Sequence, residues 1–493
     1  MAKKDKEFRP KARVPRGFRD RLGAEIAAER AMLERITKVY ESFGFDPLET
    51  PAFEYTDALG KFLPDVDRPN QGVFSLQDDD EQWMSLRYDL TAPLARFVAE
   101  NYDGLPKPFR RYAVGPVWRN EKPGPGRFRQ FTQCDADTVG APAPHADGEI
   151  CAMLASAIEA AGIERGDYVV KLNDRRIIDA AIETCGDKDA GEKRLAIMRA
   201  MDKLDRLGPD GVRLLLGSGR KDESGDYTDG AGLSDAAAAR ILSVLAPAGD
   251  DIGSVCDALD EALGASEEGK RGVADMRRMG SDLLASGYGS DRIRLDPSVI
   301  RGLEYYTGPV FEAELTFQTT DEKGRPVRFG SIGGGGRYDD LVKRFKGVEV
   351  PAVGVSIGVS RLLAALDMQR GGAPEAEGPV VVLALDQAEM ARYQSMAAEL
   401  RAAGVRAEVY LGGANFGKQL KYADKRRAPA AIIEGGDERA RGEVTVKDLV
   451  LGAELAKSIE DNAQWREGQP AQVSVPRDKL VEAVRGVLSR RRS

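Results

Sequence analysis

The chain has 493 residues, of which 42% are hydrophobic and 31% charged, and its formal net charge is −8. A chain of this length and composition is a folded globular protein of about three domains, which excludes a disordered or collagen-like protein. Its apolar runs are far shorter than the ~20 residues of a membrane-spanning helix. The basic N-terminus lacks the apolar stretch that secretory signals carry. We therefore expect a cytoplasmic protein without a membrane anchor.

The N-terminal third alternates between helical and strand-like patterns. Apolar residues recur at three- and four-residue spacings over 22–43, which predicts an amphipathic helix that ends at Gly44. A short extended stretch over 46–53 follows. Farther along we expect strands and a hairpin over 84–100 and 109–140, a helix over 148–163 and a strand over 168–172.

The pattern changes in the middle of the chain. From about 176 to 288 the sequence is rich in Ala, Leu, Asp, Arg and Gly at helical spacing, which predicts a helical insertion. Strand-like patterns return at 308–316 and 328–334. Helices are expected over 337–346 and 356–368.

A linker rich in Gly, Pro and Ala separates the last part of the chain from the rest. It covers residues 370–378, and beyond it strand-like runs alternate with helices, which is typical of an α/β domain. The expected segments are therefore 1–175 and 291–369 for a divided core, 176–290 for the insertion, 370–378 for the linker and 379–493 for the C-terminal domain.

The side chains available for chemistry are limited. The four cysteines form no C-x-x-C pair and the single histidine is His145, so neither a zinc site nor a Ser/His/Asp nucleophile is indicated. Charge stabilisation must come from Arg, Lys, Tyr and carboxylates. Residues 107–129 hold seven basic side chains and one acidic, which suits an anionic ligand on an otherwise acidic protein.

The most informative segment is 109–140, where two extended runs flank a turn at Lys122–Gly126. Side chains alternate between the two faces of a strand. Guanidinium groups bind phosphate, an aromatic ring offers a stacking plane, and the polar end can hold a second substrate. The alternative is a solvated strand face with a buried Phe. The first face carries Arg127, Arg129, Phe131, Gln133, Asp135 and Asp137, and the second carries Phe128, Gln130, Thr132, Cys134 and Ala136.

Three further segments stand out. In Ser85–Ala92, Asp89 and Thr91 are expected on one strand face, where they can receive an ammonium group, although a turn or strand edge is the alternative. The run Gly333–Gly336 does not fit regular structure comfortably, so we expect it to let backbone approach a ligand or another strand. A strand-turn-helix pattern ends in Arg361, which is also compatible with an ordinary solvated helix start.

Together these segments resemble the class II aminoacyl-tRNA synthetases, and specifically the histidyl-tRNA synthetase family. The helix over 22–43 with Pro51 resembles the dimer-forming motif 1 of that class, 109–137 resembles motif 2, and 354–361 resembles motif 3. Two further segments, 301–306 and 333–339, are similar to the two histidine-specific signatures of that family. The first has Glu304 where the family usually has Asp. The resemblance implies an α+β catalytic core with an antiparallel sheet, a helical insertion and a C-terminal α/β anticodon-binding domain.

The resemblance also implies a reaction: ATP-dependent ligation of L-histidine to tRNA-His through histidyl-adenylate, with Mg²⁺ at the pyrophosphate end, in a cytoplasmic homodimer. Arg119 and Arg301 are then the catalytic cations. The implied ATP-binding residues are Arg119, Glu121, Arg127, Arg129, Phe131 and Arg361. The implied histidine-binding residues are Asp89, Leu90, Thr91, Arg119, Gln133, Asp137, Arg301, Tyr305 and Tyr306. The implied tRNA-binding residues are Lys418, Lys421, Lys425, Arg426 and Arg427, for which a solvated helix face is the alternative.

Two other functions compete with this one. A catalytically inactive paralogue that acts as a regulatory subunit of ATP phosphoribosyltransferase shares the same core, but that group lacks the C-terminal domain and tends to lose the arginines present here. A synthetase for another amino acid, such as proline or threonine, is disfavoured by the segment Arg301–Tyr306.

Overall fold

The computed structural model describes residues 10–62, 72–123, 128–221, 225–246, 249, 251–302, 305–317, 319–320, 326–327, 330–369, 377–458 and 471–490. The chain divides into two compact units, Met1–Ala373 and Pro374–Ser493. Within the described ranges, none of the helices combines the length and the apolar character needed to cross a membrane.

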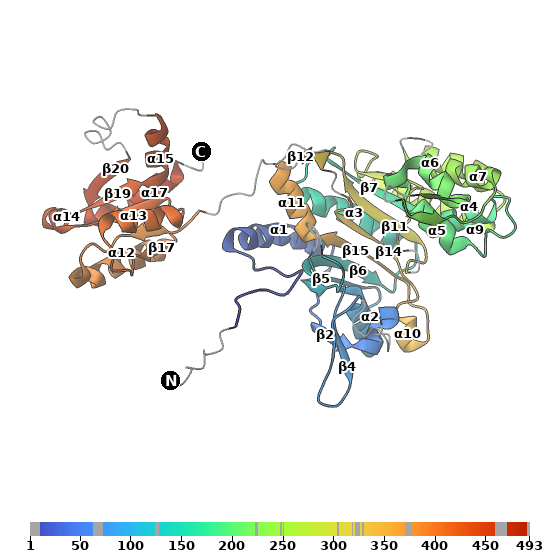
Figure 1. Ribbon diagram of the computed structural model, residues 1–493, viewed down its shortest axis with the longest axis horizontal. Coiled ribbons are helices and arrows are strands. Elements are labelled where there is room, and N and C mark those ends of the chain that lie inside the picture. Colours follow the sequence, from blue (N-terminus) through green and yellow to red (C-terminus); the bar gives the residue numbers. More distant parts are fainter. Residues whose placement is uncertain are drawn as a thin grey trace, which may run out of the picture. The chain divides into compact units, whose positions relative to one another are not determined.

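The first unit is built on an eight-stranded sheet with the order β1-β5-β6-β15-β14-β11-β7-β10 (Figure 1). Its inner neighbours from β5 to β7 all pair antiparallel, and only the two edge strands pair parallel. This confirms the α+β core with an antiparallel sheet. The strands are β1 (Asp46–Pro47), β5 (Phe109–Trp118), β6 (Gln130–Val139), β7 (Tyr168–Asp174), β10 (Ile293–Leu295), β11 (Pro309–Leu315), β14 (Gly333–Arg337) and β15 (Ala352–Gly358).

Three helices pack against one face of this sheet: α1 (Gly23–Ser42), α3 (His145–Ala161) and α11 (Val359–Gln369) (Figure 1). Helix α1 buries Met32, Ile36 and Tyr40, so the amphipathic helix predicted over 22–43 is confirmed. Cys134 and Ala136 of β6 are buried in the same apolar core. Because neighbouring side chains on a strand point to opposite faces, Gln133, Asp135 and Asp137 face away from these helices.

Smaller elements lie beyond the other face of the sheet: the three-stranded sheet β2-β4-β3, the helix α2 and the short helix α10. Their bounds are β2 (Phe53–Tyr55), β3 (Ser75–Gln77), β4 (Trp83–Leu86), α2 (Thr91–Asn101) and α10 (Lys343–Lys346), with a 3-10 helix at Thr56–Phe62. The strand prediction for 84–100 is therefore wrong beyond Leu86, because Asp89 caps a helix whose first turn tolerates Pro93. The helix predicted over 337–346 is wrong as well, since only its last four residues are helical.

The four glycines Gly333–Gly336 form most of the inner strand β14, so the expectation that they avoid regular structure is wrong. The expected close approach to another strand is present. A Cβ on Gly335 would lie 2.0 Å from the carbonyl oxygen of Gly354 in β15, and a Cβ on Gly336 would lie 2.8 Å from the Tyr306 ring. Glycine is therefore required here by the neighbouring backbone and ring, in an extended strand.

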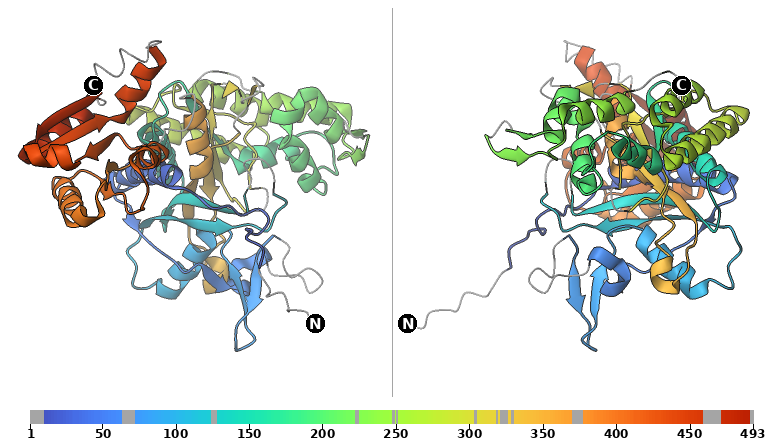
Figure 2. Two further views of the ribbon diagram at one scale, coloured as in Figure 1. Left: turned by 60° about the vertical axis from the view of Figure 1, so that its left-hand side comes forward. Right: turned by 90° about the vertical axis from the view of Figure 1, so that its right-hand side faces the viewer.

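Residues 175–285 carry the expected helices, together with a short hairpin that the sequence pattern did not indicate. The α5–α7 helices share a separate apolar cluster with Ile178 and Ile182 of α4, whereas α8 and α9 pack into the main core with α3. Figures 1 and 2 show these helices gathered at one end of the first unit. The elements are α4 (Arg175–Glu183), α5 (Arg194–Met201), α6 (Leu204–Leu216), β8 (Gly219–Lys221), β9 (Tyr227–Asp229), α7 (Asp235–Leu245), α8 (Ile252–Leu263) and α9 (Glu267–Ala285).

One polar contact joins these helices to the helix layer of the core. His145 begins α3, and its Nδ1 lies 2.6 Å from the carboxylate of Asp282 on α9. The His145 side chain is 73% exposed. This pair lies at the surface and contributes little to the apolar core beneath it.

The second unit is a five-stranded sheet of order β17-β16-β18-β19-β20 with an apolar cluster on each face. Strands β17, β16 and β18 are parallel, and β19 and β20 are antiparallel to their neighbours. This confirms the predicted α/β domain. Its elements are β16 (Val380–Val382), α12 (Met390–Ala402), β17 (Ala407–Val409), α13 (Phe416–Lys425), β18 (Ala430–Ile433), α14 (Gly436–Arg441), β19 (Glu443–Asp448), α15 (Leu449–Ser458), β20 (Gln472–Pro476) and α17 (Leu480–Ser489).

Candidate active site

The hairpin of β5 and β6 carries most of the predicted site. Its register places Arg111 opposite Asp137, Ala113 opposite Asp135 and Gly115 opposite Gln133. The far side of β6 is flanked by β15, where Gly354 lies opposite Asp137. Three polar side chains therefore follow one another along a strand in the interior of the sheet, with a glycine beside two of them.

Asp137 is fully buried between two polar partners. Its Oδ2 lies 2.8 Å from Nη2 of Arg111, and the Tyr338 hydroxyl donates a hydrogen bond to its Oδ1. Burial raises the pKa of the Asp137 carboxyl, while the Arg111 charge and the Tyr338 hydrogen bond act in the opposite direction. The net shift of this pKa is upward, so the two partners offset the effect of burial only in part.

Two neighbouring side chains on the same face have polar atoms without partners. The amide of Gln133 donates to Ser356 Oγ at 2.8 Å, but its Oε1 is buried and has no hydrogen-bond partner within the described ranges. Asp135 Oδ1 is in the same state. Burial, together with the nearby charge of Asp137, raises the pKa of Asp135 to about 7. Buried polar atoms of this kind are costly unless a ligand supplies the missing partner.

The Asp89–Thr91 segment is the turn that begins α2, so Asp89 and Thr91 do not share a strand face as expected. Asp89 Oδ1 accepts the backbone N–H groups of Thr91 at 3.1 Å and of Ala92 at 2.9 Å. The carbonyl of Leu90 accepts a hydrogen bond from Arg111 at 2.9 Å. Burial raises the pKa of Asp89, and the charges of Arg119 and Arg111 oppose that rise. The segment is thereby fixed close to β5.

The tyrosines of the 301–306 signature close over the same face. The ring centroids of Tyr305 and Tyr306 are 5.2 Å apart, and Tyr305 packs 5.7 Å from Tyr338. The Tyr305 hydroxyl is buried without a hydrogen-bond partner in the part of the chain that the structure describes. Burial raises the pKa of Tyr305, and so do the charges of Asp89 and Asp137. Leu303 and Glu304 lie outside the described residues.

Arg119 follows β5 directly and connects the polar pocket to an aromatic ring. Its Nε donates to the Tyr88 carbonyl at 3.2 Å, and its guanidinium lies 5.1 Å from the centre of the Phe131 ring. A cation and a stacking surface are therefore adjacent at one end of the β6 face. Of the other motif 2 residues, Arg127 lies outside the described ranges.

Glu121 lies near the start of the hairpin loop after β5, and Arg129 lies at its end, directly before β6. The backbone carbonyl of Glu121 accepts a hydrogen bond from Arg129 Nε at 3.0 Å. Arg129 also donates to the carbonyl of Arg16 at 3.4 Å. Arg129 thus links the backbone at Arg16 to the backbone at Glu121.

The two remaining arginines come from other elements. Arg301 forms an ion pair with Glu312 of β11, and Arg361 of α11 donates to the carbonyl of Ser331. Burial lowers the pKa of Arg301; the charges of Asp202 and Tyr306 act against this, and the like charge of Arg361 adds to it. Arg301 and Arg361 therefore lie close enough for their charges to interact.

The structure thus gathers predicted site residues into one polar cluster on the β6 face, with Arg119 and Phe131 at one end of that strand; the cluster contains Asp89, Leu90, Thr91, Gln133, Asp137, Tyr305 and Tyr306. Sequence reasoning missed three residues that complete the pocket: Arg111, Tyr338 and Ser356. The first could have been found, because a hairpin centred on residue 124 necessarily pairs residues 111 and 137. Tyr338, which directly follows β14, and Ser356 of β15 lie within the segments 333–339 and 354–361 singled out above, but the sequence did not indicate that either side chain reaches β6.

The five basic residues predicted to bind tRNA lie on or just after α13. Lys418, Lys421, Lys425, Arg426 and Arg427 are all exposed. Arg426 pairs with Glu408 of β17 at 3.0 Å. The helix therefore presents a basic surface, part of which is neutralised by a neighbouring carboxylate.

Comparisons with known proteins agree with this arrangement. The family model for histidyl-tRNA synthetase matches residues 17–362, and the model for the anticodon binding domain matches residues 379–486. A protein of Caulobacter vibrioides named histidine–tRNA ligase is 58% identical over 98% of both chains. Another of that name from Cereibacter sphaeroides is 57% identical over 99% of this chain and 100% of its own.

A solved structure gives the same result. The crystal structure of histidyl-tRNA synthetase from Nostoc sp. PCC 7120 superposes with a TM-score of 0.72 at 28% identity, over 97% of this chain and 99% of that one. Sequence, site and fold lead to one conclusion: this chain belongs to the histidyl-tRNA synthetase family.

Proposed function

We propose that the pocket on the β6 face activates L-histidine with ATP, forming histidyl-adenylate, and that the histidyl group then passes to tRNA-His. The observation that carries this assignment is the set of buried polar atoms on Gln133, Asp135 and Tyr305 that have no partner within the described ranges. They surround a carboxylate, Asp137, which forms an ion pair with Arg111; burial raises the pKa of this carboxyl and the Arg111 charge opposes the rise. An imidazole with one N–H donor and one acceptor nitrogen suits this mixture of groups.

The histidine side chain and the amino group take separate parts of the pocket. Asp137 accepts the imidazole N–H, and Tyr305, with Tyr306 beside it, reads the second ring nitrogen. Asp89, Thr91 and Gln133 receive the α-ammonium, and Leu90 lines the pocket between them. Since Asp89 Oδ1 is already bonded to two backbone N–H groups, its Oδ2 is the atom that accepts the ammonium.

The ATP end lies toward Arg119. A histidine carboxylate oxygen attacks the α-phosphorus, the bond from that phosphorus to the bridging oxygen breaks, and pyrophosphate leaves. Arg119 and Arg301 stabilise the charge at the α-phosphate, which requires fixed cations and no proton transfer. Phe131 and Arg361 hold adenine between them. Arg127, Arg129 and Arg361 bind the β- and γ-phosphates, and Glu121 contacts ATP.

We also assign Mg²⁺ to the phosphates. No group of three or more carboxylate, imidazole or thiol side chains able to hold a metal ion occurs among the residues that the structure describes. The ion is therefore held mainly by phosphate oxygens, as Mg²⁺ is in other ATP sites. When bound it neutralises charge at the pyrophosphate end.

The remaining parts of the chain serve tRNA and assembly. Residues 1–175 and 291–369 form the catalytic core, 176–290 the insertion, 370–378 the linker and 379–493 the anticodon-binding domain. The exposed Lys418, Lys421, Lys425, Arg426 and Arg427 contact the tRNA backbone, where cations fix position without reading sequence. Helix α1 joins two chains as a cytoplasmic homodimer.

The test is ATP–pyrophosphate exchange measured with each amino acid in turn. We expect exchange with histidine alone, and attachment of histidine to tRNA-His when tRNA is added. Exchange with proline or threonine would contradict the assignment of the pocket. A chain that exchanged pyrophosphate with no amino acid would instead act as a regulatory paralogue.

A further inference from the structure

One guanidinium nitrogen lies between the two halves of the histidine pocket. Nη2 of Arg111 is 2.8 Å from Asp137 Oδ2 and donates a hydrogen bond of 2.9 Å to the Leu90 carbonyl. Its contact with Asp137 Oδ2 is an ion pair and not a hydrogen bond, because that oxygen has no hydrogen-bond partner among the described residues. The Arg111 side chain is 1% exposed.

The two partners belong to different parts of the proposed site. Asp137 lies on the sheet and reads the imidazole, whereas Leu90 separates Asp89 and Thr91, which receive the amino group. Arg111 therefore sets the distance between the turn before α2 and the strand β6. Its Nε and Nη1 are buried with no hydrogen-bond partner in the described part of the chain, so this guanidinium is held by the hydrogen bond and the ion pair of Nη2.

Charge gives the same side chain a second effect. Asp89, Asp135 and Asp137 are three carboxylates in one interior region, and the Arg111 charge lowers the pKa of each against the effect of burial. Buried carboxylates near each other disfavour one another's ionised forms. Without Arg111, the carboxylate that accepts the imidazole N–H would be protonated more readily and free to turn.

We propose that Arg111 is a positioning residue for histidine recognition, which holds the Asp137 carboxyl group in register with the Asp89–Thr91 turn. This inference rests on the proposed function, because it needs Asp137 to read the substrate. Arg111 acts through Asp137 and Leu90 and is not itself assigned to the reacting atoms. Its effect should therefore fall on histidine and not on ATP.

The experiment measures KM for histidine and for ATP by pyrophosphate exchange in Arg111→Met, in Arg111→Lys and in a matched control. The control is Arg110→Met, which removes the adjacent arginine on the other face of β5, where it pairs with Glu149 at 3.0 Å. We expect Arg111→Met to raise KM for histidine about 10- to 100-fold, the range for a lost hydrogen bond to a charged group. KM for ATP should change less than about twofold, and the control should alter neither.

If Arg111→Met does not fold, the two KM values can still be measured in Arg111→Lys. Its single ammonium retains the charge but cannot reproduce the geometry of a guanidinium that bonds two groups at once. We expect it to bind histidine more tightly than Arg111→Met and more weakly than the unchanged protein. A lysine variant with unchanged KM for histidine would overturn the proposal.

A double variant separates positioning from general damage. If Arg111 acts through Asp137, the Arg111→Met and Asp137→Asn changes together should raise KM for histidine hardly more than the larger single effect. Multiplied effects, or an equal rise in KM for ATP, would overturn the proposal. If Asp137→Asn alone left KM for histidine unchanged, the proposed role of Asp137 would fail, whatever Arg111 does.

Discussion

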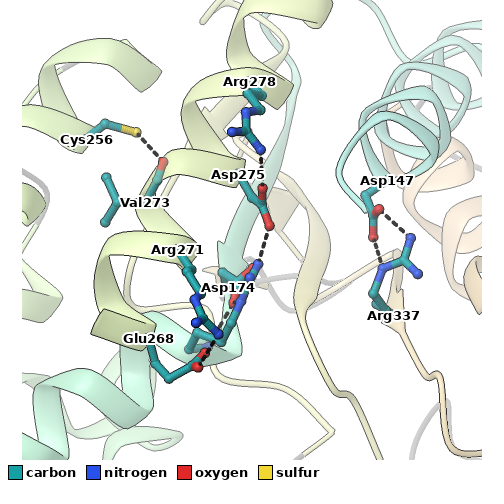
Figure 3. A network of polar contacts seen from close by, with 10 residues as sticks. Asp147, Asp174, Cys256, Glu268, Arg271, Val273, Asp275, Arg278 and Arg337 are labelled. Atoms are coloured by element: carbon teal, nitrogen blue, oxygen red, sulfur yellow. Dashed lines mark hydrogen bonds and ion pairs between the residues drawn. The ribbon is translucent and has the colours of Figure 1, made fainter. Parts of the chain in front are cut away.

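The guanidinium of Arg337 binds the carboxylate of Asp147 with two parallel hydrogen bonds, from Nε to Oδ1 at 3.0 Å and from Nη2 to Oδ2 at 2.6 Å (Figure 3). Arg337 ends the glycine strand β14, and Asp147 lies in the first turn of α3. Both side chains are buried. The pair therefore links the end of the glycine-rich strand β14 to helix α3.

Removal of one partner should be far more harmful than removal of both. Arg337→Met leaves Asp147 buried without its cation, and we expect a loss of about 3–5 kcal/mol of unfolding free energy. The double variant Arg337→Met/Asp147→Leu should recover much of that loss. Chemical denaturation of the three proteins checks this, and a double variant less stable than the single one would contradict it.

Asp135 should make stability depend on pH. Burial raises its pKa to about 7 in the folded chain, well above the ~3.9 of an unfolded chain. The native state then binds more protons between these values, so the contribution is complete below pH 3.9 and is lost as pH rises through 7. Asp135→Asn should thus stabilise the protein by about 1–4 kcal/mol at pH 8 and by less at pH 5.

Thermal melts of Asp135→Asn at both pH values test this sign. The exposed Asp79→Asn is the control, and we expect its melting temperature to follow that of the unchanged protein at each pH. A stabilisation by Asp135→Asn that was the same at pH 5 and pH 8 would mean that the carboxyl is not the titrating group.

Arg301→Ala should reduce kcat for histidine-dependent pyrophosphate exchange by about 100-fold or more, because it removes a fixed cation from the transition state. Its side chain is 41% exposed but its partner Glu312 is buried, so the variant should also lose some stability, and exchange is measured well below its melting temperature. The comparison is Arg294→Ala, an exposed arginine on β10. Near-normal exchange by Arg301→Ala would mean that the Arg301 side chain serves only as a structural partner of Glu312.

A chain that ends at Gly378 should still form histidyl-adenylate but charge tRNA-His poorly. The first compact unit contains every residue proposed for ATP and histidine. Loss of the basic α13 surface should also weaken the salt dependence of tRNA binding, since fewer counterions are released. Exchange and charging are compared at two salt concentrations. An equal loss of both activities would mean that the second unit stabilises the core.

Local patterns predicted the elements whose signals lie within one segment. The helix over 22–43 and the alternating faces of β6 follow from periodicity, and the structure confirms both. The turn at Asp89 was misread because two polar residues two apart fit a strand face as well as a helix cap. The prediction for Gly333–Gly336 is wrong because a side chain there would collide with the Gly354 carbonyl and the Tyr306 ring. Both lie far away in the sequence, so no local pattern indicates them.

The position of His145 has a practical consequence for spectroscopy. It is the only histidine in the chain, its side chain is 73% exposed, and it is held by Asp282 on the surface formed by α3 and α9. When protein and histidine are both ¹⁵N-labelled, the imidazole region of the NMR spectrum would therefore contain only the two ring nitrogens of His145 beside those of the substrate. The tautomer and protonation state of the bound imidazole can then be observed directly, at the nitrogen atoms that Asp137 and Tyr305 are proposed to distinguish.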